Sequence, residues 1–248
     1  MFALVELPPA IIDQCGYHRT TLKRVALVHD WLNQLGGAED VLVALKRLFP
    51  SAPVFTSIYD RARMPAAWRD WDIRPNWMDR LPGIHRHHQP YMPLYALAFG
   101  AERIPAEYDL IISNKSAFCF AVRGANPDAR HICYCLTPTR FIYDFEAYAA
   151  RERIPGIAVP ALRLANAALR RFERAAAQRV TTLVAISSEV QRRISALYGR
   201  ESEVIYPPVD FTAFTLREDK DGIYLTASRM VPYKRIDLIV EAFATMPD

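Results

Sequence analysis

Two glycines stand where this sequence changes from a strand pattern to a helix pattern. Gly36 and Gly37 follow the apolar run Val25–Val28 and precede Ala38–Phe49, whose apolar residues recur at helical spacing. Because glycine has no side chain, a phosphate can approach the free amides and positive dipole end of the next helix. A tight turn that needs a positive φ explains the same pair. Both interpretations stay open on these residues alone.

A second cluster places cations in a loop between an apolar run and a helical pattern. The loop is Ser228–Arg235, and its Arg229 and Lys234 can neutralise a diphosphate, one as a bidentate guanidinium and the other as a point charge. Open α/β sheets bind ligands in loops at such strand ends. Charge spacing alone favours a solvated basic loop.

Other chemical patterns are weaker. The chain has neither the G-x-G-x-x-G fingerprint nor a P-loop, so dinucleotide dehydrogenases and P-loop NTPases lose support. Asp70–Asp72 and Asp219–Asp221 each place two carboxylates one residue apart, a metal-binding pattern that is common by chance. The histidines of His85–His88 are better explained as a solvated basic patch. We therefore expect no metal site.

Composition bounds the class of protein. The 248 residues are 51% hydrophobic and 23% charged, which excludes disordered and collagen-like chains. Lys and Arg exceed Asp and Glu by 31 to 27, a balance that does not indicate nucleic-acid binding. Four cysteines without zinc spacing favour a reducing compartment, with Cys133 and Cys135 as core thiols. No run approaches the roughly 18 apolar residues of a spanning helix, so we expect a cytoplasmic protein.

Strand-like and helix-like patterns alternate along the chain, which predicts an α/β fold with a doubly wound parallel sheet. Residues 61–100 resist assignment. Ser188 with Gln191 resembles a capping box, and Gly199 is a suitable helix end. The expected strands are Val25–Val28, Pro53–Tyr59, Leu110–Ile112, His131–Leu136, Leu183–Ile186, Glu203–Tyr206 and Ile223–Thr226. The expected helices are Ala38–Phe49, Pro160–Gln178, Ser188–Tyr198 and one that carries Ile236, Ile239, Val240 and Phe243 on one face.

Four ordered motifs give a domain plan and a family resemblance. The sequence resembles glycosyltransferase family 4 from Lys23 to Asp248, and its second motif is similar to a mannosyltransferase branch of bacterial surface polysaccharide synthesis. In chain order, the motifs are His29–Leu32 with Gly36–Glu39, then Tyr134–Arg140 with Tyr143–Asp144, then Val184–Ser187 with Val204–Asp210, and finally Ser228–Phe243. We expect an extension at 1–22, an acceptor-side domain at 23–210, a linker at 211–221 and an incomplete donor domain at 222–248. Since one β-α unit cannot bury its own core, we expect a truncated chain.

The resemblance implies a GT-B architecture, in which two Rossmann-like domains face each other across a cleft. It implies retaining transfer of a hexose, mannose from GDP-mannose above all, to a glycan or lipid-linked acceptor, without metal or cofactor. Carried over by position, Gly36, Gly37, Arg229 and Lys234 would bind the donor phosphates, where fixed cations stabilise the leaving group. The acceptor side of the cleft would include His29, Asp30, Glu39, Thr137 and Arg140.

Two departures from the family pattern leave a rival hypothesis. Leu136 stands where the family usually has a histidine that touches the transferred sugar, so no catalytic residue is assigned, and no two glutamates have the spacing of the family's Glu, seven residues, Glu motif. We therefore expect the 248 residues alone to be inactive. The rival is a non-catalytic remnant that binds a glycan or a protein partner.

The Arg151–Arg179 region is rich in arginine, with seven against two acidic residues. Basic amphipathic segments can lie on anionic membranes, which gives contact with the inner membrane face as a further expectation. An ordinary surface helix is the favoured alternative.

Overall fold

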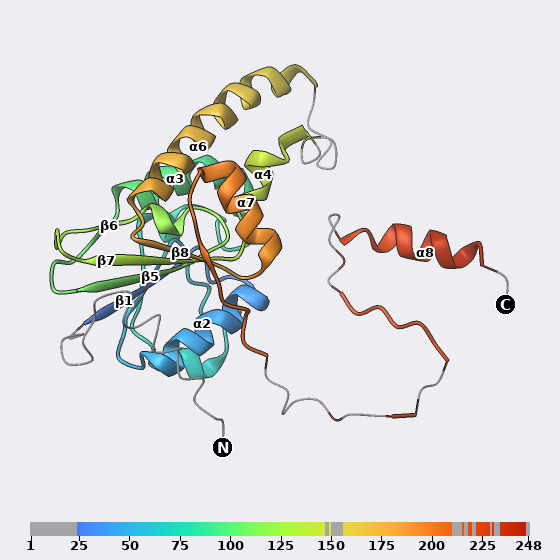
Figure 1. The fold of residues 1–248 in the computed structure, drawn as a ribbon, viewed down its shortest axis with the longest axis horizontal. Helices are drawn as coiled ribbons and strands as arrows, with labels where there is room; N and C mark the ends of the chain where they lie inside the picture. Colours follow the sequence, from blue (N-terminus) through green and yellow to red (C-terminus); the bar gives the residue numbers. More distant parts are fainter. Residues whose placement is uncertain are drawn as a thin grey trace.

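The computed structural model describes residues 24–146, 149, 156–209, 215, 218–219, 222–228, 230 and 234–246. Its centre is a seven-stranded sheet in the order β3-β2-β1-β5-β7-β8-β9, in which every pairing is parallel (Figure 1). The strands are β1 (Val25–His29), β2 (Val54–Thr56), β3 (Ile73–Pro75), β5 (Leu110–Lys115), β7 (Arg130–Cys135), β8 (Thr182–Ala185) and β9 (Glu203–Val204). The predicted α/β class with a parallel sheet is confirmed.

Helices cover both faces of the sheet, with α2 on one face and α3 and α6 on the other (Figure 1). The helices are α2 (Gly37–Leu48), α3 (Met92–Ala101), α4 (Arg140–Tyr143), α6 (Val159–Arg179), α7 (Ser188–Tyr198) and α8 (Ile236–Ala244). Short 3₁₀ segments lie between them, among them η4 (Cys119–Ala121), and β4 (Arg103–Ile104) pairs with β6 (Arg123–Gly124) in a separate two-stranded sheet.

Each central strand is buried on two sides. In β1, Leu27 packs with Leu42 of α2 in one cluster, while Ala26 and Val28 belong to the other cluster, with Phe99 of α3. Successive strand residues point to opposite faces, so a strand between two helix layers favours apolar residues on both faces. This is the physical reason for the unbroken run Val25–Val28.

The helix ends agree with their sequence signals except at one cap. Gly199 ends α7 in the left-handed region at φ 65°, as expected. The N-cap of α7 is Ser187 and not Ser188, because the Ser187 side chain accepts the amide of Val190 at 3.2 Å. The predicted capping residue was therefore wrong by one position.

The expected strand at Ile223–Thr226 is absent, since no strand is formed within the described residues 222–228. Leu225 is 86% exposed, and no residue of α8, which follows, is buried. A segment becomes a strand only by pairing with another one. The expected helix after this segment does form, as α8. The expected extension at 1–22 lies outside the described residues, and the linker at 211–221 lies largely outside them.

No helix among the described residues is both long enough and apolar enough to cross a bilayer.

Candidate functional site

The sheet changes winding direction between β1 and β5. The chain leaves β1 toward β2 on one side, whereas β5 is hydrogen-bonded to β1 on the other. The loops after these two strands therefore diverge, and open α/β sheets bind ligands in the crevice formed there. His29, which ends β1, lies opposite Asn114 of β5 in the strand register. This switch point is the candidate site.

The N-terminus of α2 opens at the switch point. Gly36 is its N-cap and supplies no side-chain cap, and Gly37 is its first residue. A Cβ built on Gly37 meets nothing within 4 Å, so the space before the helix is open. The first amides of a helix have no partner within it and carry the positive end of its dipole. The geometry suits an anionic group held against the backbone.

Three buried polar side chains link β1, β5 and α2 beneath this opening. His29 Nε2 lies 3.3 Å from Glu39 Oε1, and His29 Nδ1 lies 3.3 Å from Asn114 Nδ2. Asn114 Nδ2 also donates to the carbonyl of Ala38 at 2.6 Å. All three side chains are nearly inaccessible to solvent. The chain of contacts therefore fixes the start of α2 relative to the ends of two strands.

Asp30 acts on the backbone of the loop after β5. One oxygen accepts the amides of Ser116 and Ala117 at 2.7 Å each, and the other accepts those of Phe118 and Cys119 at 2.8 Å each. The carboxylate thus satisfies four amides that enter η4. Both of its oxygens are engaged, so Asp30 fixes the backbone of the loop that follows β5.

The loop after β7 reaches the same edge of the sheet. Leu136 and Thr137 are half-buried, and Arg140, at the start of α4, is exposed. Thr137 accepts a hydrogen bond from buried Lys115 of β5, with its carbonyl oxygen 2.9 Å from Nζ. The structure thus brings the expected residues of β1, α2 and this loop to one edge.

The structure describes only part of the second cation cluster and shows that part away from this edge (Figure 1). Arg229 lies outside the described residues. Lys234 lies just before α8, and Figure 1 shows α8 well apart from the sheet. The predicted phosphate-binding roles of Arg229 and Lys234 stay predictions.

The expected solvated patch at His85–His88 is wrong for His88, which is buried. Asp221 lies outside the described residues, so Asp219–Asp221 stays untested. Asp72 pairs with Arg74, with Nη2 2.6 Å from Oδ2, and His85 contacts Asp79 at 2.9 Å. Within the described part of the chain, no three His, Cys, Asp or Glu side chains gather in a way that could hold a metal ion. Cys133 and Cys135 are fully buried, as predicted for core thiols.

Three buried polar residues of this region were not predicted: Asn114, Lys115 and Glu173. The signal for the first two was weak, since Asn-Lys directly follows the apolar residues of β5 at the carboxyl end where ligands bind. Glu173 is surrounded by arginines in the sequence and gives the pattern of a solvated helix.

Fold and site together define a Rossmann-like domain in which helix α2 begins, at Gly37, beside the switch point of the sheet. A family model described as Glycosyltransferase Family 4 matches residues 35–213, and the chain belongs to this family. No curated protein and no solved structure matches the chain. Family membership indicates a retaining glycosyltransferase that binds a nucleotide-sugar donor and an acceptor.

Proposed function

We propose that this protein transfers a hexose, mannose from GDP-mannose, with retention to a glycan or lipid-linked acceptor in surface polysaccharide assembly. The observation that supports transfer is the open helix start at Gly37 beside the ends of β1 and β5, within the family match. Mannose, GDP and the pathway are inferred from the similarity of Tyr134–Arg140 to one branch of the family.

The chemistry assigned to the chain is charge stabilisation at a leaving diphosphate. The amides at Gly37 would hold a donor phosphate, and Arg229 and Lys234 would add fixed positive charge. We propose no metal and no cofactor for this step. Cations and helix dipoles act most strongly where water is excluded, as between two closed domains.

The test is calorimetric titration of the native protein with GDP-mannose, GDP-glucose, UDP-glucose and UDP-N-acetylglucosamine. We expect GDP-mannose to bind most tightly. Preferential binding of a UDP sugar would reassign the donor, while binding of none would overturn the proposed function.

Leu136 supports the second candidate, a non-catalytic domain that binds a glycan or a protein partner. A leucine side chain can neither donate nor accept a hydrogen bond to a sugar. This candidate predicts that glycans bind while no nucleotide sugar is consumed. A glycan array screened with the native protein, followed by a turnover assay on the same preparation, separates the two candidates.

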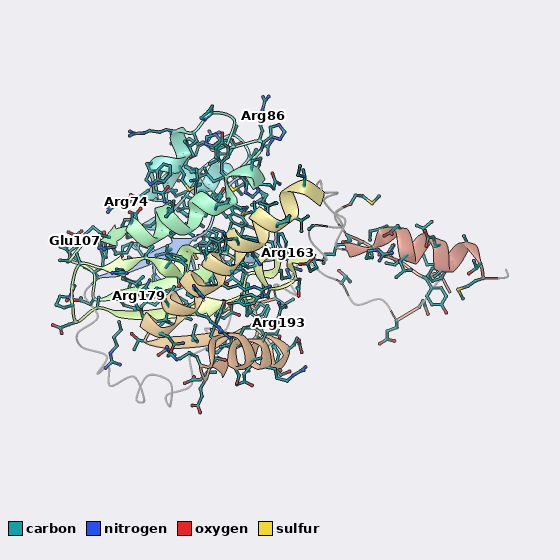
Figure 2. The ribbon with its side chains drawn as sticks, turned by 90° about the horizontal axis from the view of Figure 1, so that it is seen from above. Arg74, Arg86, Glu107, Arg163, Arg179 and Arg193 are labelled. Carbon is teal, nitrogen blue, oxygen red and sulfur yellow. The ribbon has the colours of Figure 1, made fainter. Side chains whose placement is uncertain are left out.

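Membrane contact through the Arg151–Arg179 region is a proposal that the arginines support only in part. Arg163 and Arg179 lie at opposite ends of α6 (Figure 2), and Arg163 pairs with Glu146 at 2.8 Å while Arg179 donates to the carbonyl of Ala121 at 3.2 Å. The exposed apolar residues are better evidence, since Ile157 is 93% and Leu164 76% exposed. Liposome flotation with and without anionic lipid tests it, and binding that ignores lipid charge would contradict a role for the arginines.

A further inference from the structure

A fully buried ion pair lies beneath the loop that follows β7. Lys115 ends β5, Glu173 lies in α6, and neither side chain has exposed surface. Lys115 Nζ lies 2.9 Å from Glu173 Oε1. Burial alone would lower the pKa of Lys115, but the charge of Glu173 and their hydrogen bond outweigh burial and raise it. The lysine therefore remains charged inside the protein.

The other two N–H donors of the Lys115 ammonium group bind the loop that follows β7. The ammonium group donates to the carbonyl of Thr137 at 2.9 Å and to Thr139 Oγ1 at 3.2 Å. An ammonium group has three donors, so the contact with Glu173 completes the set. The backbone carbonyl of Lys115 also accepts the amide of Leu136 at 2.9 Å. One residue thus fixes the loop at Leu136, Thr137 and Thr139.

Glu173 holds the same loop from the helix side. Its Oε1 lies 2.6 Å from Thr139 Oγ1, 3.2 Å from the Thr139 amide and 2.7 Å from the hydroxyl of Tyr198 in α7. The pair consequently joins β5, the loop after β7, α6 and α7. Side chains or backbone atoms from all four elements therefore converge on this pair.

Stability does not account for the pair. Glu173 Oε2 is buried with no hydrogen-bond partner among the described residues, which is unfavourable for a carboxylate. Buried ion pairs are in general no more stabilising than apolar side chains of the same shape. The pair does fix the position of the loop, because four of its hydrogen bonds involve defined atoms of Thr137 or Thr139.

The loop that is held lies at the carboxyl edge of the sheet. It follows β7, the strand next to β5, and it carries the half-buried Leu136 and Thr137 and the exposed Arg140. A shift of this loop would move these three side chains relative to Gly37 and the switch point. Small misplacements at such a site reduce rates strongly.

We propose that Lys115 and Glu173 are positioning residues, which hold residues 136–140 at the carboxyl edge of the sheet in the arrangement that sugar transfer requires. This inference rests on the proposed function, because the rate of transfer is what the fixed loop serves. Neither residue touches substrate: Lys115 acts through Thr137 and Thr139, and Glu173 acts through Thr139.

The test compares Lys115→Met and the double variant Lys115→Met/Glu173→Gln with the parent protein. The single variant leaves an unpaired buried carboxylate, while the double variant removes both charges and retains side-chain volume. Arg24→Gln/Glu107→Gln is the matched control, because that ion pair is exposed, at 3.6 Å, and lies at the opposite end of β1. The readouts are melting temperature, hydrogen exchange of the peptide covering 136–140, and kcat and KM for the sugar nucleotide.

We expect the single variant to melt well below the parent, and the double variant to regain most of the loss. In the double variant, exchange at 136–140 should still be about tenfold faster and kcat about tenfold lower, with the donor KM unchanged. The control should match the parent in every readout.

Exchange at 136–140 is judged against the peptide covering β1 in the same variant. If both peptides accelerate equally, or if neither exchange nor kcat changes, the proposal is overturned. If the parent consumes no nucleotide sugar, the proposed function fails, and the exchange data alone then decide whether the pair fixes the loop.

Discussion

Asp30 Oδ1 accepts the backbone amide of Cys119 at 2.8 Å, which joins the end of β1 to the start of η4 across 89 residues of sequence. The same carboxylate accepts hydrogen bonds from three further amides. One side chain thus provides the acceptors for the four amides that lead into η4. We predict that Asp30→Asn destabilises the protein by about 2–4 kcal/mol, because the amide group puts donors where donors already point. Urea unfolding measures this. Asp128→Asn, at an exposed position, is the control and should stay within roughly 0.5 kcal/mol of the parent.

A substitution at Gly37 should change donor affinity without lowering the stability of the fold. A Cβ at this position meets nothing within 4 Å, so Gly37→Ala should fold as well as the parent, with a gain of up to about 1 kcal/mol from helix propensity. The added methyl group would stand before the helix amides, and we expect donor affinity to fall about tenfold, or ~1.4 kcal/mol. Titration calorimetry and thermal melting check the two effects.

Gly199→Ala is the contrasting variant, because Gly199 has a φ of 65° that alanine adopts at a cost of about 1 kcal/mol. It should lower the melting temperature and leave donor affinity unchanged. A Gly37→Ala protein with unchanged donor affinity would contradict the phosphate role of α2.

Two buried histidines predict acid sensitivity. Burial lowers the pKa of His88 to about 4, and burial together with the charge of Arg179 lowers that of His131 to about 4. The unfolded chain, with ordinary histidine pKa values near 6.5, binds protons more readily, so stability is complete above pH 6.5 and is lost as the pH falls toward 4. Protonation of each histidine should lower the free energy of unfolding by up to roughly 3 kcal/mol between pH 6.5 and pH 4.

The measurement is the free energy of unfolding from urea titrations at pH 7, 6 and 5, above the range in which most carboxylates titrate. His131→Gln should flatten the slope, since it removes one of the two groups and keeps a polar partner for Ser113, whose Oγ lies 2.8 Å from His131 Nε2. An unchanged slope in this variant would show that His131 is not the source.

A substitution at Leu136 distinguishes the proposed glycosyltransferase from the second candidate, a non-catalytic binding domain. Leu136→His would place a hydrogen-bonding group at the edge of the sheet, where Leu136 is half-buried. If the scaffold transfers sugar, we predict a gain in turnover of about tenfold or more from a new polar contact at the reacting sugar. The assay is release of nucleoside diphosphate. Leu136→Asn, which is also polar but of different reach, is the control, and no activity in any of the three proteins favours the remnant.

Local patterns predicted most of the sheet because its strands are buried on both faces. In the sequence, β1 and β5 contain unbroken apolar runs, which indicated strands. Helices α2 and α7 bury one side only, so their apolar residues recur at helical spacing, which indicated helices. Helix α3 was missed because it is apolar nearly throughout and shows no such period. The strand expected at Ile223–Thr226 failed for the opposite reason: its composition was suitable, but pairing depends on a neighbour that composition does not reveal.

From the residue patterns alone, the candidate site was predicted only where one loop carries it, whereas His29, Asp30, Glu39, Thr137 and Arg140 were expected from the family resemblance. Gly36 and Gly37 are adjacent in sequence, so their pattern was visible. Lys115 and Glu173 are 58 residues apart and meet only because α6 packs on the face of the sheet in which β5 is a central strand (Figure 1). Lysine and glutamate are rarely buried unless they are paired with an opposite charge. Neither residue on its own therefore indicates, from the sequence, that it is buried.

The most direct test of the central claim is turnover of GDP-mannose by the native protein, followed by NMR of the transferred sugar. We predict that GDP-mannose is consumed in preference to other sugar nucleotides and that the α configuration of the donor is retained in the product. Inversion of configuration would contradict the retaining mechanism, and failure to consume any sugar nucleotide would contradict transfer itself.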